Sequence, residues 1–116
     1  MKDLALVFVG GGSGAILRFL TSKGVRFFMP HKMWLSTLIV NVVGSLIMVY
    51  LYKNFNDQPE AFKKMVQVGI LGGLTTYSSF SLDIFSLVSK GSYSEALLVF
   101  LLNIMFGIVV GIFIFR

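Results

Sequence analysis

Residues 69–81 read GILGGLTTYSSFS, and this stretch decides how the chain is interpreted. Two adjacent glycines, Gly72 and Gly73, interrupt an apolar run. Five hydroxyl side chains besides Tyr77 then follow within seven positions: Thr75, Thr76, Ser78, Ser79 and Ser81. Paired glycines are poor helix formers. A break at membrane depth frees backbone amides and carbonyls, which hydrocarbon tolerates only beside protein or a water-filled cavity. The stretch therefore predicts a broken membrane helix that faces a site.

The rest of the chain is typical of an all-α membrane protein. It has 116 residues, of which 56% are apolar and 13% charged, too few charges to cover the surface of a soluble domain. Crossing the hydrocarbon core takes roughly 20 apolar residues in a helix. We expect a single membrane domain with four spans, at about 4–20, 34–52, 65–88 and 94–115.

A cleavable signal peptide is the competing interpretation of the first span, because Ser13-Gly14-Ala15 offers small residues. The uninterrupted apolar stretch Leu4–Val9 is short, however, and Asp3 weakens the positive start. Both features favour an uncleaved span.

The distribution of positive charge predicts how copies of the chain insert. Ten Lys and Arg residues lie singly between apolar runs, which is typical of membrane anchors and unlike a nucleic-acid surface. With four spans, each side of the membrane holds five of them: Lys2, Lys53, Lys63, Lys64 and Arg116 on one side, and Arg18, Lys23, Arg26, Lys32 and Lys90 on the other. Without a bias the chain inserts both ways, so we expect an antiparallel, dual-topology homodimer.

Each polar side chain within the spans has a structural and a functional interpretation. Asn41 is either a helix–helix hydrogen bond or a donor that lines a path. The hydroxyl run either bonds to its own helix carbonyls or lines that path, and its density favours the path. Tyr77 and Phe80 share a helix face, where their rings either pack against neighbours or turn their positive edges toward an anion. Arg18 either snorkels to the interface or attracts an anion.

The remaining polar residues give less information about function. Asp83 caps the third span, pairs with a lysine or faces a vestibule, and Asn103 is expected to join helices. The chain has no cysteine, no histidine pair, no paired carboxylates and no phosphate loop, and His31 lies alone in a loop. We therefore expect no enzyme activity.

Three motifs together resemble the fluoride channels called Fluc or CrcB. They occur in the family's order and cover the whole chain: Gly11-Gly12-x-Gly14-Ala15-x-x-Arg18, Asn41-x-x-Gly44, and Gly69-x-x-Gly72-Gly73-Leu74-Thr75-Thr76-Tyr77-Ser78-Ser79-Phe80-Ser81. The resemblance implies a fluoride-selective channel in a bacterial plasma membrane, built as an antiparallel homodimer that conducts fluoride passively.

The resemblance also implies roles for individual residues. Asn41 is the second-helix donor to fluoride. Tyr77 and Phe80 present their ring edges to the ion, and a hydroxyl track follows: Thr76, Ser78 and Ser79. Backbone carbonyls of Gly72 and Thr75 hold a structural Na⁺, and two copies of the break would supply four oxygens.

This chain departs from the family at two positions. Tyr77 stands where the family usually has Phe, and Ser79 where it usually has Thr. The tyrosine hydroxyl adds a donor and bulk to the path. The alternatives are a small dual-topology multidrug exporter, which needs a membrane-buried carboxylate, and a non-transporting assembly subunit. In a multidrug exporter, Asp83 would be the membrane carboxylate. An assembly subunit would leave the hydroxylated third span without a role.

Overall fold

The computed structural model describes the backbone of residues 1–116 and every side chain except that of Phe115. Two long helices come first, α1 (Lys2–Phe28) and α2 (Trp34–Asn54). The third hydrophobic segment is made of four pieces: α3 (Glu60–Lys63), the π-helix η1 (Lys64–Leu71), α4 (Gly72–Leu74) and α5 (Tyr77–Ser89). The last helix is α6 (Tyr93–Phe115). The expectation of an all-helical membrane protein is confirmed.

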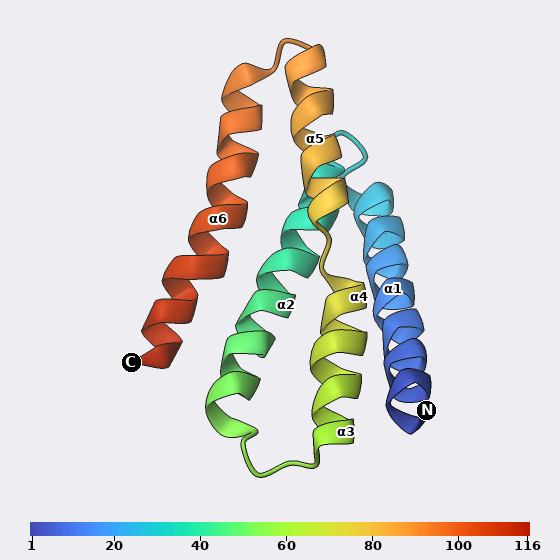
Figure 1. Cartoon of the computed structure of the whole chain (residues 1–116). Helices are drawn as coiled ribbons and strands as arrows, with labels where there is room; N and C mark the ends of the chain where they lie inside the picture. Colours follow the sequence, from blue (N-terminus) through green and yellow to red (C-terminus); the bar gives the residue numbers. More distant parts are fainter.

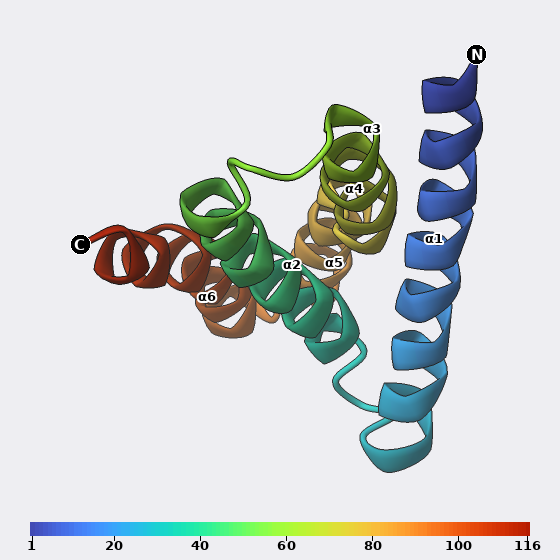
Figure 2. The same cartoon turned by 90° about the horizontal axis from the view of Figure 1, so that it is seen from below.

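α2, α5 and α6 run up and down in Figure 1, whereas α1 is steeply inclined to them and is seen almost lengthwise from below in Figure 2. α1 and α6 lie at the two sides, and α2 and the broken third segment lie between them, as both views show (Figures 1 and 2). The two termini and the loop after α2 are at the same end in Figure 1, and the α5–α6 loop is at the opposite end. This arrangement suits a chain that crosses a membrane repeatedly.

Three helices are long and apolar enough to cross a bilayer without interruption: Lys2–Phe28, Trp34–Asn54 and Tyr93–Ile114. Large apolar side chains are exposed along all three, among them Phe8, Ile47 and Ile108, so the described chain buries only a small core. In water this surface would drive aggregation, whereas lipid or a second protein chain covers it favourably.

The third segment is broken, but not at the glycine pair. Gly72 and Gly73 are helical and begin α4, whereas the backbone becomes extended at Thr75 (φ −78°, ψ 154°) and Thr76 (φ −151°, ψ 119°). Figure 1 shows this as the unwound stretch between α4 and α5. The prediction that the glycines themselves break the helix was therefore wrong by about one turn.

The glycines serve close packing against α1 instead. A Cβ on Gly10 would lie 2.5 Å from a carbonyl oxygen of η1, and a Cβ on Gly69 would lie 2.9 Å from the Gly10 Cα atom. A Cβ on Gly14 would collide with the Ile70 carbonyl oxygen, and one on Gly73 with the backbone of α1. Small residues let the two backbones touch, which is how helices associate where lipid gives no hydrophobic drive. This contact fixes the end of α4 and hence the position of the break.

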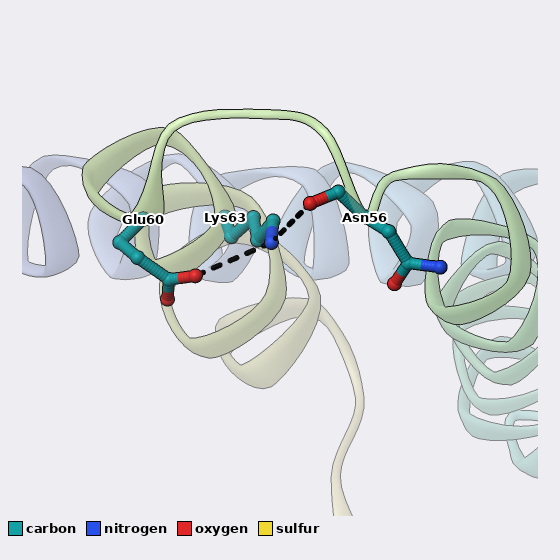
Figure 3. A network of polar contacts seen from close by, with 3 residues as sticks. All are labelled: Asn56, Glu60 and Lys63. Atoms are coloured by element: carbon teal, nitrogen blue, oxygen red, sulfur yellow. Dashed lines mark hydrogen bonds and ion pairs between the residues drawn. The ribbon is translucent and has the colours of Figure 1, made fainter.

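Polar contacts hold the start of the third segment, at α3 and the first residue of η1. Lys63 Nζ donates to the Asn56 carbonyl oxygen at 2.9 Å and to Glu60 Oε1 at 3.2 Å, which ties the α2–α3 loop to α3 (Figure 3). Lys64 Nζ pairs with Asp3 Oδ2 at 3.0 Å and joins η1 to the start of α1. These exposed ion pairs are individually weak. Together they tie the start of the third segment to the preceding loop and to α1.

Candidate functional site

The side chain of Asn41, on α2, bridges the break between α4 and α5. The Thr76 amide donates to Asn41 Oδ1 at 2.7 Å, and Asn41 Nδ2 donates to the Thr76 carbonyl oxygen at 3.1 Å. One side-chain amide thus satisfies both backbone groups of the residue where the helix unwinds. An unsatisfied group at this depth would cost several kcal/mol, on the order of the transfer penalty for a bare amide.

Asn41 has a second partner that the sequence did not reveal. Its other Nδ2 hydrogen is donated to Asn103 Oδ1 at 3.1 Å, and Asn103 Nδ2 donates to the Val99 carbonyl oxygen of its own helix at 2.9 Å. Asn103 therefore joins α6 to α2, and the expected helix–helix role is present. In addition, its carbonyl oxygen competes for a hydrogen of Asn41.

Two further contacts hold the ends of the break. Arg18 Nε, on α1, donates to the Gly73 carbonyl oxygen at 3.2 Å. Thr76 Oγ1 caps α5 by accepting from the Ser79 amide at 3.1 Å and shares a hydrogen bond with Ser78 Oγ at 3.2 Å. An oxygen at the N-cap position satisfies one of the amides that open a helix. Thr76 thus serves both the backbone and the hydroxyl track.

The two carbonyls that the resemblance assigns to Na⁺ have both lost their helical donors. In a continuous helix the Thr76 amide would donate to Gly72 and the Ser79 amide to Thr75. Here those amides donate to Asn41 Oδ1 and Thr76 Oγ1 instead. Gly72 is exposed and Thr75 partly exposed. The break therefore offers two carbonyl oxygens to a partner outside the described chain.

The aromatic pair lies directly beside the break. Tyr77 and Phe80 have ring centroids 5.9 Å apart with planes inclined by 57°. Phe80 is 8% exposed and stacks on Phe100 of α6 at 6.1 Å, whereas Tyr77 is 80% exposed. The Phe80 ring is therefore held by packing within the chain, whereas the Tyr77 ring lies on its surface.

Cavities reach the break from both of its sides. The largest, of about 470 Å³, is lined by Arg18, Thr37, Thr76, Ser79 and Asp83 among others. A second, of about 250 Å³, holds the asparagine pair and the aromatic pair together: Asn41, Asn103, Tyr77 and Phe80. A third, of about 330 Å³, continues along α2 and α6 past Asn41 and Ser45 to Gly107. Most of the expected site residues thus line two neighbouring cavities, whereas Gly72 and Ser78 are exposed and line none of the three.

Asp83 is the acidic residue of the largest cavity. Its Oδ2 atom is buried and has no hydrogen-bond partner among the described residues. Trp34 closes the same end of the molecule, donating from Nε1 to Glu95 Oε1 at 2.8 Å. The vestibule interpretation of Asp83 agrees with this placement. Ser36 and Thr37 line the same cavity as Asp83, which the sequence alone did not reveal, because isolated hydroxyls on a helix carry no signal.

Comparison with known proteins identifies relatives over nearly the whole chain. The family described as CrcB-like protein, Camphor Resistance (CrcB), matches residues 5–114. A protein of Magnetococcus marinus named fluoride-specific ion channel FluC is 39% identical over 94% of this chain and 97% of its own length. A protein of the same name from Azotobacter vinelandii is 44% identical over 73% of this chain and 71% of its own. A protein of the same name from Coxiella burnetii is 33% identical over 88% of this chain and 86% of its own length.

These matches confirm the resemblance read from the three motifs. They cover the glycine-rich first helix, the helix that carries Asn41 and the broken third segment together. Because the family model and the relatives match nearly the whole chain, and the fold contains the expected break, this chain belongs to the CrcB-like protein family.

Proposed function

We propose that this protein is a fluoride-selective channel that conducts fluoride passively across a bacterial plasma membrane. The observation that carries the proposal is the convergence of neutral donors on the break. The Asn41 amide, the Thr76 hydroxyl and the rings of Tyr77 and Phe80 meet where two open cavities adjoin. Relatives that match most of this chain bear the name fluoride-specific ion channel.

Neutral donors suit fluoride because the ion is small and strongly hydrated. Removing its water is costly, so the protein must replace the water with donors of its own. Full charges would hold the ion too tightly for release. No charged side chain lines the two cavities that adjoin Asn41, as far as the described residues go. With an inside-negative potential, such a path expels fluoride that entered the cell as the uncharged acid.

The hydrogen bonds of Asn41 indicate how it would donate. Both of its Nδ2 hydrogens are engaged, one by the Thr76 carbonyl and one by Asn103 Oδ1. The first bond holds the break, so the second is the one that an arriving ion would exchange. A charge-assisted hydrogen bond is about twice as strong as a neutral one, which favours the exchange. Arg18, at the wall of the largest cavity, would raise the local concentration of anions before this step.

The site requires a second copy of the chain, in our proposal an antiparallel one. Tyr77 and Ser78 of the proposed path and Gly72 of the proposed Na⁺ site are all exposed on the described chain. An ion beside them would face hydrocarbon unless another protein covered it. The equal charge on the two sides supports insertion in both orientations, with residues 60–89 as the third of four crossings in one multi-pass domain. A homodimer is the simplest assembly of this kind; pairing with a paralogue would need a second gene.

A structural Na⁺ fits the free carbonyls of Gly72 and Thr75. Hard cations prefer oxygen ligands, and these two oxygens have lost their helical donors. Gly72 and Thr75 would hold the ion together with their counterparts in the second copy. When bound, the ion would supply a fixed positive charge beside the break.

Asp83 is the residue on which a proton-coupled exporter would depend, because it is the carboxylate that lines the largest cavity. The family and the neutral donor set favour the channel. Fluoride flux that requires a pH gradient and is lost in Asp83→Asn would favour coupled export instead.

The channel assignment predicts a specific efflux. Purified protein in liposomes loaded with fluoride should release it rapidly once valinomycin carries the counter-charge, as a fluoride electrode would record. Chloride-loaded liposomes should lose little chloride. Asn41→Asp keeps the acceptor for the Thr76 amide but removes both donated hydrogens, and should slow efflux roughly ten- to hundredfold, the loss of about 1.5–3 kcal/mol for a hydrogen bond to an ion.

The matched control is Asn54→Asp, which makes the same change at the exposed end of α2 and should leave efflux unchanged. The absence of fluoride flux through well-folded wild-type protein would refute the channel. Equal loss of fluoride and chloride would leave a pore without selectivity and would direct attention to Tyr77 and Ser79.

Dual topology predicts labelling from both sides of the membrane. The chain contains no cysteine, so Gln58→Cys introduces a single thiol in the exposed loop after α2 and leaves the count of positive charges unchanged. A membrane-impermeant maleimide added to intact cells should label about half of the copies, because the two orientations are equally populated. Labelling of all copies, or of none, would contradict antiparallel assembly.

The sodium proposal predicts cation-dependent stability of the purified protein. Replacing Na⁺ with the larger K⁺ should lower the melting temperature, because ligands that bind only the folded state stabilise it. The carbonyls are backbone groups, so no side-chain change removes them cleanly. An unchanged melting temperature between NaCl and KCl of equal ionic strength would count against the site.

A further inference from the structure

Ser45 lies one helical turn beyond Asn41 on α2, on the same face of the helix. It lines both the cavity that holds the asparagine and aromatic pairs and the cavity that continues toward the end of α2. Asn41 and Thr75 are the other residues that these two cavities share. Ser45 therefore stands at the junction through which anything leaving Asn41 in this direction must pass.

The hydroxyl of Ser45, unlike those of Ser13, Thr21 and Thr75, is not bonded to its own helix backbone. Ser13, Thr21 and Thr75 each donate to the carbonyl four residues earlier, at 2.8–2.9 Å. Ser45 Oγ has no hydrogen-bond partner among the described side chains and backbone groups. Among the described residues, the fully buried side-chain polar atom without a partner is Asp83 Oδ2, so the Ser45 hydroxyl is open to the cavities that it lines, where it can donate to a polar species.

The opposite wall of the cavity leaves room for such a species. Gly107 of α6 faces Ser45, and a Cβ on it would lie 3.7 Å from Ser45 Oγ. A larger side chain at this position would fill the space between the two helices. The glycine thus keeps about 330 Å³ open next to the hydroxyl, with Met48 and Val49 as its apolar lining.

Resting on the proposed function, we propose that Ser45 Oγ is the fluoride donor that follows Asn41, and that the path continues between α2 and α6 across Gly107. The hydroxyl can donate its hydrogen without giving up another bond, whereas Asn41 must exchange its bond to Asn103. An ion that leaves Asn41 thereby gains a neutral donor about one helical turn, roughly 5 Å, farther along. Its distance from Arg18 and the largest cavity increases at the same step.

Fluoride efflux from liposomes tests the role of the hydroxyl. Ser45→Ala removes the donor and leaves the cavity slightly larger, and we expect about a tenfold slower efflux. Ser45→Thr retains the hydroxyl and should restore efflux to near the wild-type rate. Ser13→Ala is the matched control, since its hydroxyl bonds within α1 and lines none of the cavities described, and it should behave as wild type.

Thiol labelling tests the cavity independently of flux. Ser45→Cys gives the chain a single thiol, and a water-soluble methanethiosulfonate reagent should modify it, because only a hydrated thiol ionises and reacts. Ile108→Cys, at an exposed apolar position of α6, should react far more slowly. Gly107→Leu, which fills the cavity, should block modification of Ser45→Cys.

The outcomes separate this inference from the proposed function. If the wild-type protein releases no fluoride, the channel itself is refuted. If the wild type conducts and Ser45→Ala conducts equally well, the channel stands and the role of Ser45 is overturned. A Ser45→Cys thiol that does not react in folded protein would likewise overturn it, because the path beyond Asn41 would then be dry.

Discussion

The amide of Asn41 and the backbone of Thr76 form the contact on which the rest of the site depends. A helix that unwinds within a membrane leaves amides and carbonyls without partners, and lipid offers none. Asn41 supplies an acceptor to the Thr76 amide and a donor to its carbonyl, so the chain can unwind there without an unsatisfied pair. Without this clamp, a continuous helix would be the more stable backbone, and the carbonyls of Gly72 and Thr75 would be used within it.

The surrounding structure positions this clamp and keeps it accessible. α1 meets η1 and α4 through glycines, which bring Arg18 within reach of the Gly73 carbonyl. α6 contributes Asn103, which orients the Asn41 amide, and Phe100, which holds the Phe80 ring. Apart from Arg18, which bonds to a backbone carbonyl, the side chains that make these contacts are neutral. Neutral groups that satisfy the backbone also line the path, and they suit a dehydrated anion that must be released again.

Much of this architecture could be predicted from the sequence, because it follows from hydrophobic runs and from motifs. The long apolar stretches predicted helices close to α1, α2 and α6, the glycine pair predicted a break in the third segment, and the hydroxyl run predicted a polar lining beside it. The exact place of the break could not be predicted. Gly72 and Gly73 are poor helix formers, but their packing against α1 outweighs that propensity, which costs only about 1 kcal/mol per glycine.

The partners of the site residues were also beyond sequence reasoning. The bonds from Asn41 to Asn103 and from Arg18 to Gly73 join residues more than fifty positions apart, and no periodicity relates them. Ser45 was missed for a different reason. A serine in an apolar helix normally bonds to its own backbone, so only its place in the walls of two cavities that also hold Asn41 singles it out.

The central claim is that the Asn41 amide at the break binds fluoride. The most direct test is the nitrogen NMR signal of the Asn41 side chain in detergent-solubilised protein, titrated with NaF and, separately, with NaCl. We predict a fluoride-dependent shift of that signal that saturates and that chloride does not produce. A signal that fluoride leaves unmoved, or that chloride moves equally, would contradict the account.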